Sequence, residues 1–467
     1  MKKNEELHSL IKSLNKSERR YFRLFCGNNS DSNVYHRLFE EIDKQEIYNE
    51  SDIKRIFASE KFVKQLTTAK NYLRNLILKA LRNYYADISK NSSLKDTLKN
   101  IEILYHKGLY KHAEFEVKKA IKNAQQYENY TALYEAVFWK RRLLQAVRPD
   151  ADAELKEISL KQLDCTGHLT AYTNAWRSNI GITPDQADSA ILEHDALQTR
   201  LMKGLHNYQL NIIQNNTPDA LQVLKSVVKD MEAHPHRLVE ESEMYLSIVN
   251  NLIAFFIFMK QYDNAYQYID QVKTHLSFIK NPGAPIYKIL LRTYNIELEI
   301  YRDQRDFKKA LILIDEINKL LKNPNVQAPI TYRISFWFQF ANLYFINQNY
   351  SEALKWINRL LEYRSDESRP DLIIYAHWLN LMVHYELKNM FVLRYFVDST
   401  KRHLQKRKKI DPFERALLQL FSRVSRVPES ESSIHFRIAQ KTLAKKGNVI
   451  PEEILDYVDF NEWIEKH

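Results

Sequence analysis

The chain has 467 residues, of which 45% are hydrophobic and 27% charged, and its formal net charge is +11. This composition excludes a disordered chain, and the longest apolar run, residues 252–259, is too short to cross a bilayer. Only 7 glycines and 12 prolines are present, fewer than strands and tight hairpins need, so an almost entirely helical chain is expected. The positive excess favours acidic proteins, anionic lipid or nucleic acid as partners.

Neither the amino terminus nor the cysteines indicate export. The first residues lead into an amphipathic helix without the apolar core and small-residue cleavage site of a signal peptide. Cys26 and Cys165 lie far apart, and neither has a second cysteine nearby, so a disulfide framework or zinc cluster has no support. We therefore expect a soluble protein in the reducing cytoplasm.

Residues 1–92 are predicted to form a small helical bundle or the first cap of a helical array. Asn15 and Glu18 have the spacing of a capping box at the start of an apolar, aromatic helix. Apolar residues then recur at helical spacing, and residues 62–85 are expected to make one long helix. The segment carries 18 Lys and Arg against 12 Asp and Glu, and these charges either lie on solvated helix faces or contact a polyanion.

Residues 93–210 are predicted to form irregular helical hairpins. An early copy of the later repeats places a turn three residues before Ala113. Prolines and glycines interrupt the pattern after about residue 148, where two or three helices are expected and their boundaries stay open.

Residues 211–404 are predicted to be two-helix repeats. Four alanines, each after an aromatic or turn residue, lie 45, 45 and 43 residues apart, and this period is typical of stacked helical hairpins. First helices are expected after prolines, which suit the first helical turn, and second helices after short polar turns that supply N-caps. The alanines are Ala220, Ala265, Ala310 and Ala353, the prolines are Pro285, Pro329 and Pro370, and the N-caps are Asp306 and Asn349.

A fifth hairpin ends this series, and residues 405–467 are predicted to cap it. The fifth hairpin keeps a period of 40 residues but has Leu393 at the position of the alanines. Residues 457–464 include tyrosine, phenylalanine and tryptophan, and the exposed end of a solenoid needs such a cover over its last apolar face.

The repeats resemble the tetratricopeptide repeat family over about 200 residues, although the units are longer than the family's usual 34 residues. The resemblance implies a right-handed superhelix of elongated helical hairpins. The layout of a helical front end and an array is also similar to bacterial regulators that read signalling peptides. With Ala353 aligned to the alanine of that family's second helix, the signature positions fall on Trp337, Phe340, Ala341, Tyr344 and Tyr350, while Glu297, Leu298 and Ile253 depart from the pattern in other units.

The sequence lacks the motifs of common catalytic and cofactor sites. No P-loop, dinucleotide-binding, serine-hydrolase or zinc-protease motif is present. His234 and His236 have no third ligand beside them, so a polar turn is favoured over a metal site. The acidic run at residues 240–243 is interpreted as the first turn of a helix. We expect no catalytic residue, no metal and no cofactor; an enzyme would need a site assembled from scattered residues.

The functional surface of a tetratricopeptide superhelix is usually the groove lined by first helices. Amides in such a groove can hold a peptide backbone, arginines its carboxylates and aromatic residues its apolar side chains. The alternative is that the aromatic residues pack between hairpins. The predicted protein- or peptide-binding residues are Asn250, Arg292, Asn295, Arg302, Phe338, Asn342, Tyr375 and Trp378.

Two functions follow from these patterns. The first is a non-catalytic scaffold that binds a protein or peptide in the groove. The second is a regulator in which the array senses a ligand and the amino-terminal segment contacts DNA or the transcription machinery, with Lys70, Arg74, Lys79 and Arg82 as polyanion contacts. The alternative for these four residues is a packing helix with a basic outer face. A helix-turn-helix motif would require a glycine-containing turn before its recognition helix.

Overall fold

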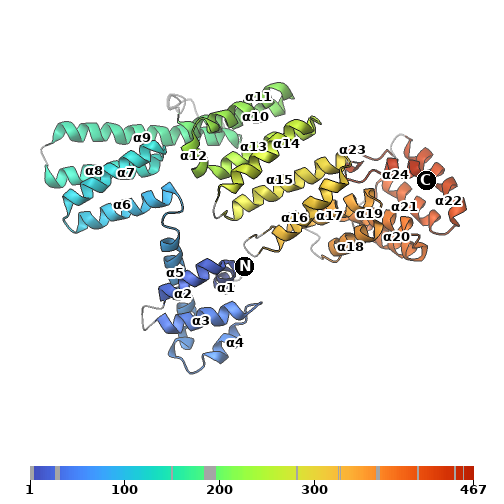
Figure 1. The fold of residues 1–467 in the computed structure, drawn as a ribbon, viewed down its shortest axis with the longest axis horizontal. Helices are drawn as coiled ribbons and strands as arrows, with labels where there is room; N and C mark the ends of the chain where they lie inside the picture. Colours follow the sequence, from blue (N-terminus) through green and yellow to red (C-terminus); the bar gives the residue numbers. More distant parts are fainter. Residues whose placement is uncertain are drawn as a thin grey trace. The chain divides into compact units, whose positions relative to one another are not determined.

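The computed structural model describes residues 5–26, 32–148, 151–182, 196–279, 282–323, 326, 328–363, 369–406, 410–445, 449–455 and 457–467. These residues form α-helices joined by turns, with one 3₁₀ helix and no strand among them (Figure 1). The prediction of an all-helical chain is confirmed. None of the described helices combines the length and the apolar character that a membrane span requires.

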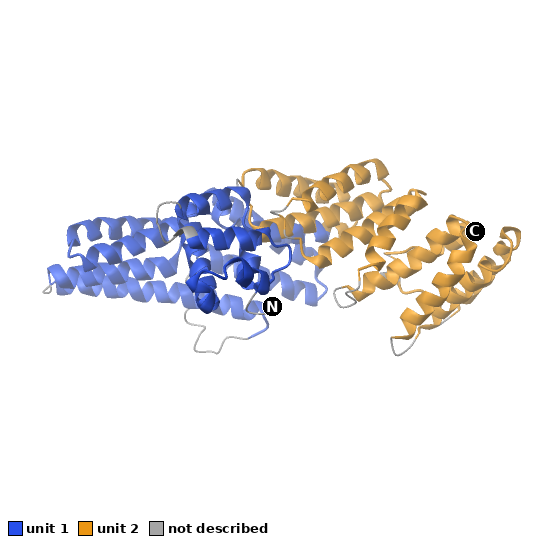
Figure 2. Ribbon diagram, turned by 90° about the horizontal axis from the view of Figure 1, so that it is seen from below, with its two compact units in different colours: residues 1–255 blue, residues 256–467 orange. Residues whose placement is uncertain are grey.

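The chain divides into two compact units, residues 1–255 and 256–467, which Figure 2 shows in separate colours. Each unit contains two of the main clusters of buried apolar residues. The domain junctions expected from the sequence, after residues 92, 210 and 404, stay predictions.

The first helices of unit 1 form a bundle around a core of their own. Leu73 and Ile77 of the long helix and Phe22 and Phe39 of the preceding helices are buried in this core. Asn15 and Glu18 make the predicted reciprocal capping bonds, so the capping box is confirmed. The elements are α1 (Glu6–Ser13), α2 (Lys16–Cys26), α3 (Ser32–Lys44), α4 (Glu50–Ile56), the 3₁₀ helix η1 (Lys61–Gln65) and α5 (Leu66–Tyr84).

The other helices of unit 1 pack mainly on their neighbours in sequence. A separate apolar core joins the first four of them, with Trp139 among its largest side chains. The boundary between the units lies inside the last one. These helices are α6 (Lys90–His106), α7 (Tyr110–Gln126), α8 (Tyr130–Val147), α9 (Asp152–Asn179), α10 (Leu197–Ile213), α11 (Thr217–Glu232), α12 (Pro235–Glu240) and α13 (Ser242–Phe258).

Unit 2 contains helix pairs followed by shorter helices at the carboxyl end. The first helices of two successive pairs, α17 (Ile330–Ile346) and α19 (Pro370–Glu386), are buried on nearly every side; residues 334–343 of α17 are all buried. A helix that is hydrophobic all round belongs in a core, and these two carry no solvated face. The helices are α14 (Tyr262–Ser277), α15 (Ala284–Asp303), α16 (Phe307–Leu321), α17 (Ile330–Ile346), α18 (Tyr350–Leu361), α19 (Pro370–Glu386), α20 (Met390–Gln405), α21 (Pro412–Val424), α22 (Glu429–Leu443), α23 (Glu452–Leu455) and α24 (Phe460–Lys466).

The predicted helix starts agree with the structure. The helices α15, α17 and α19 begin at or beside Pro285, Pro329 and Pro370. Asp306 and Asn349 cap α16 and α18, because each side chain accepts a hydrogen bond from the backbone amide three residues on. The four repeat alanines and Leu393 are at most 1% exposed, so all five positions are occupied by fully packed side chains.

A recurring turn precedes each of these five positions and also the buried Ala113 of the early copy. A residue with positive φ lies five residues before the alanine, and the amide of the next residue bonds to the carbonyl five positions back, as in a Schellman motif. Glycine takes this conformation without strain, yet only one of the six turns has it. The six residues are Gly108, Asn215, Lys260, Arg305, Gln348 and Lys388.

Candidate functional site

None of the eight residues predicted to line a groove is exposed. Asn250, Phe338, Asn342 and Trp378 are buried, and the other four are half-buried. Asn295 in α15 accepts hydrogen bonds from two side chains of α17, Ser335 at 2.9 Å and Gln339 at 3.1 Å. Arg302 lies 3.0 Å from Asp303 in the same helix. These two polar residues therefore hold neighbouring groups of unit 2.

The face of α17 and α19 is covered by the chain's own carboxyl end. We call residues 449–467 the C-terminal segment. Asn342 donates its amide hydrogen to the backbone carbonyl of Tyr457 at 2.7 Å, although the two residues are 115 positions apart. The Tyr457 ring stacks on Tyr375, with 4.8 Å between centroids, and lies 6.1 Å from Phe338. Three of the predicted binding residues thus contact one tyrosine of the C-terminal segment.

The next aromatic residues of the C-terminal segment are also anchored. Phe460 is fully buried and meets Trp378 edge-on, with 6.0 Å between centroids. Trp463 stacks on Phe421 of α21 at 5.4 Å and meets Tyr385 of α19 edge-on at 5.5 Å. Aromatic residues at positions 457, 460 and 463 therefore occupy successive positions along the α17, α19 and α21 surface.

A carboxylate of α19 fixes the end of the C-terminal segment. Glu386 Oε1 accepts the indole hydrogen of Trp463 at 2.7 Å and lies 2.8 Å from His467 Nε2. Burial would raise the pKa of Glu386, but the hydrogen bonds from His467 and Trp463 and the nearby positive charges hold it below its ordinary value. Arg305 also forms an exposed ion pair with Glu462. The Glu386 carboxylate is thus ionised while the C-terminal segment is in place.

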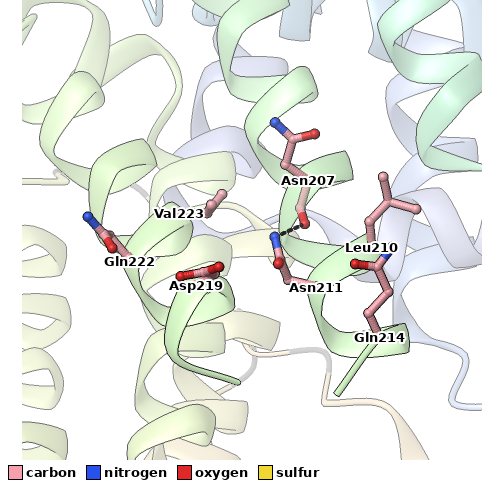
Figure 3. A pocket seen from close by; sticks show the side chains of 7 residues that line it. All are labelled: Asn207, Leu210, Asn211, Gln214, Asp219, Gln222 and Val223. Carbon is pink, nitrogen blue, oxygen red and sulfur yellow. Dashed lines mark hydrogen bonds between the residues drawn. The ribbon is translucent and has the colours of Figure 1, made fainter. Parts of the chain in front are cut away.

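A second feature is an open, amide-lined cleft in unit 1, drawn in Figure 3. It lies between α10 and α11 and has a volume of about 360 Å³. One internal hydrogen bond crosses a turn of α10, from Asn211 Nδ2 to the Asn207 carbonyl at 2.8 Å. The lining side chains are those of Asn207, Leu210, Asn211, Gln214, Asp219, Gln222 and Val223. Asp219 accepts a hydrogen bond from Asn216 at 2.6 Å. The amides of the cleft can donate and accept together, so its lining does not favour one class of ligand.

A larger cavity, about 770 Å³, is a polar space in unit 1 between helix ends of α6 to α10 and α12. Arg237 is buried there and lies 2.8 Å from Glu128 and 3.6 Å from Glu241. The Tyr130 and His168 rings stack at 3.9 Å. Because the buried guanidinium is matched by carboxylates, the cavity presents no unbalanced charge.

The described residues contain no cluster of three or more His, Cys, Asp or Glu arranged to hold a metal ion. The rings of His234 and His236 lie 6.4 Å apart, with His234 at the start of α12. The acidic run that was expected to open a helix instead spans the junction of α12 and α13.

The four predicted polyanion contacts have different environments. Lys70 is buried and lies 2.6 Å from Glu50, so its charge is used inside the bundle. Arg74, Lys79 and Arg82 are exposed on α5. Three of the four cations therefore point to solvent.

No protein-family model matches the sequence, and no curated protein matches it. The function must therefore be inferred from the chain's own residues. Sequence patterns identified the residues 457–464 as a cover but not the surface that they occupy. The signal that was available is the spacing of the aromatic residues Tyr457, Phe460 and Trp463, three positions apart.

Proposed function

We propose that this chain is a non-catalytic scaffold that binds a protein or peptide segment on the face of unit 2 formed by α17 and α19. In this proposal the helix pairs form a right-handed superhelix of tetratricopeptide-like hairpins. The recurring turn and the buried small residue support it, because they repeat with the same period as the hairpins.

One observation carries the proposal: the C-terminal segment occupies this face in the way that a bound peptide would. A side-chain amide, Asn342, holds the backbone carbonyl of Tyr457, and aromatic side chains pack against Phe338, Tyr375 and Trp378. Backbone capture combined with buried aromatic anchors is a common mode of peptide recognition. The predicted ligand is a short segment with three aromatic residues spaced as in 457, 460 and 463.

A tethered segment competes strongly with any ligand from solution. Linking gives it an effective concentration on the order of 1 mM. If the segment and a free peptide bind equally well, with a Kd of about 1 μM, the apparent Kd of the free peptide rises about 1000-fold. We therefore expect the unaltered chain to bind such peptides weakly, and binding to appear when the segment is released.

The test uses the full-length chain with its segment weakened. In the double variant Phe460→Ala and Trp463→Ala, a labelled synthetic peptide of residues 449–467 should bind at least about 100-fold more tightly than to the unaltered chain, as measured by fluorescence anisotropy. The matched control is Phe391→Ala, which removes an 86% exposed ring from α20. Circular dichroism checks that each variant keeps its helical content.

The proposal fails if the double variant stays helical and the peptide still does not bind. A peptide with alanine at the positions of 457, 460 and 463 separates specific capture from adhesion to exposed apolar surface. Equal binding of both peptides would also contradict the proposal.

A further inference from the structure

The outward face of α5 carries exposed positive charge. Residues 61–86 contain six Lys and Arg and neither Asp nor Glu. One of the six is Lys70, which is buried against Glu50. The other five are exposed, and none of them is within 4 Å of a carboxylate of the described residues; they are Lys61, Lys64, Arg74, Lys79 and Arg82.

Many charges in the rest of the bundle are paired with one another. Six carboxylates of α3, α4 and the turn before η1 are used in ion pairs with cations of the bundle, so these acids do not compensate the five cations of η1 and α5. The ion pairs are Arg19 with Asp43, Arg23 with Glu40, Arg37 with Glu60, Lys44 with Glu41, Lys54 and Lys70 with Glu50, and Arg55 with Asp52. The positive excess of the segment is therefore concentrated in η1 and α5.

The exposed cations of α5 share a face. At about 100° per residue, Arg74, Lys79 and Arg82 fall within an arc of about 140°, and Arg74 and Arg82 are about 12 Å apart along the axis. Polar side chains fill the space between them; Asn71 and Asn75 are exposed on the same arc, and Thr67 and Thr68 are exposed one turn earlier. Arginine, lysine, amide and hydroxyl groups are the side chains that contact nucleic-acid phosphates.

We propose that this face of α5 binds the phosphodiester backbone of a double-stranded nucleic acid. Charge complementarity selects a polyanion, and the absence of base-stacking surfaces on this arc selects a duplex over a single strand. The most exposed aromatic residue of α5, Tyr72, already packs against Tyr35 in a tilted arrangement, with 4.4 Å between ring centroids.

A membrane surface fits this face less well. An interfacial helix inserts large apolar side chains below its charged face. Among the described residues of α5, Tyr72 is the one large apolar side chain that is mainly exposed, whereas Leu73 and Ile77 are fully buried in the bundle. The helix therefore has no free apolar side to insert.

The test measures binding of the full-length chain to labelled 20-base-pair duplexes of DNA and of RNA, at several salt concentrations, by fluorescence anisotropy. Three to five phosphate contacts predict that log K falls with log salt with a slope of about −3 to −4.5. The variant Arg74→Glu, Lys79→Glu and Arg82→Glu should bind at least about 100-fold more weakly at 50 mM salt, because three attractive contacts become repulsive. The two duplexes show whether the backbone recognised is that of DNA, RNA or both.

The matched control reverses three exposed lysines of α16 and its end, Lys308→Glu, Lys319→Glu and Lys322→Glu, which changes the net charge by the same amount. This control should bind within about threefold of the unaltered chain if the α5 face is the site. Equal weakening in both variants would mean that only net charge matters, and would overturn the proposal.

Two further outcomes would also overturn it: no binding of either duplex by the unaltered chain at 25 mM salt, or binding to phosphatidylserine vesicles without binding to duplexes. Thermal melts of both variants, followed by circular dichroism, check that weaker binding does not come from unfolding. Because the substituted side chains are exposed, their melting temperatures should stay within a few degrees of the unaltered chain.

Discussion

Substitution of Trp463 tests how firmly the C-terminal segment is held. The side chain is 5% exposed, and its ring lies 5.3 to 5.5 Å from the rings of Tyr385, Phe421 and Phe436. Its indole nitrogen donates to Glu386 at 2.7 Å. Trp463→Ala removes both the packing and the hydrogen bond, whereas Trp463→Phe removes mainly the hydrogen bond.

The two variants differ in expected magnitude. Replacing a buried tryptophan by alanine costs about 3–5 kcal/mol, which corresponds to a factor of roughly 100 to 4000 in the docking equilibrium of the segment. Loss of a hydrogen bond to a charged acceptor costs about 1.5–3 kcal/mol. Trp463→Phe should therefore release the segment less often than Trp463→Ala.

Hydrogen exchange measured by mass spectrometry provides the assay. Peptides covering residues 457–467 and α19 should exchange fastest in Trp463→Ala, at an intermediate rate in Trp463→Phe and slowest in the unaltered chain, because amides exchange when the segment undocks. Phe391→Ala, which removes an exposed ring, should leave the rates unchanged within about twofold. Equal exchange in Trp463→Ala and in this control would refute the reasoning.

The same contact predicts a pH dependence. In the folded chain the pKa of Glu386 lies below its ordinary value of 4.5, so the ionised carboxylate stabilises docking. That stabilisation is complete above about pH 4.5 and is lost as pH falls through the lower folded pKa. Trp463→Phe removes one donor and raises the folded pKa, so acid release should begin at a higher pH. An acid transition at the same pH in both proteins would contradict this assignment.

Two further predictions concern a turn and a thiol. Gln348 has a φ of 59°, and this left-handed conformation costs a non-glycine residue about 1 kcal/mol or more. Gln348→Gly should therefore raise the melting temperature by up to a few degrees, and Gln348→Val should lower it. Identical melting curves of the two variants would contradict this. Cys26 is buried, and burial raises the pKa of its thiol to about 11. Iodoacetamide at pH 8 should therefore modify Cys26 only when guanidinium unfolds the chain. Rapid alkylation of the native chain would show that the thiol is accessible.

Local patterns were enough to predict the helical class and many helix starts. The capping box at Asn15 and Glu18 and the N-caps at Asp306 and Asn349 each depend on atoms within three residues of one another. The period of the repeat alanines predicted five positions that the structure buries. Such features depend on backbone geometry that a few neighbouring residues set, and they can be derived from sequence.

The turns show where local patterns fail. Lys260, Arg305 and Gln348 adopt positive φ, and nothing in these residue types favours that conformation. The bonds that close each helix end, and the packing of the helices on both sides, impose it. Of the six turn residues with positive φ, Gly108 is the one glycine, so the occurrence of glycine would predict only that turn.

The amino-acid sequence by itself determined the helices, their order and the concentration of positive charge in residues 61–86. The tertiary structure decided which of these side chains are available. Lys70 is hydrogen-bonded to Glu50, twenty positions earlier, and Asn342 donates a hydrogen bond to the backbone carbonyl of Tyr457, 115 positions later. Periodicity reports which face of a helix is apolar, but the group that covers that face comes from a distant part of the chain, and its position depends on the packing of the whole unit.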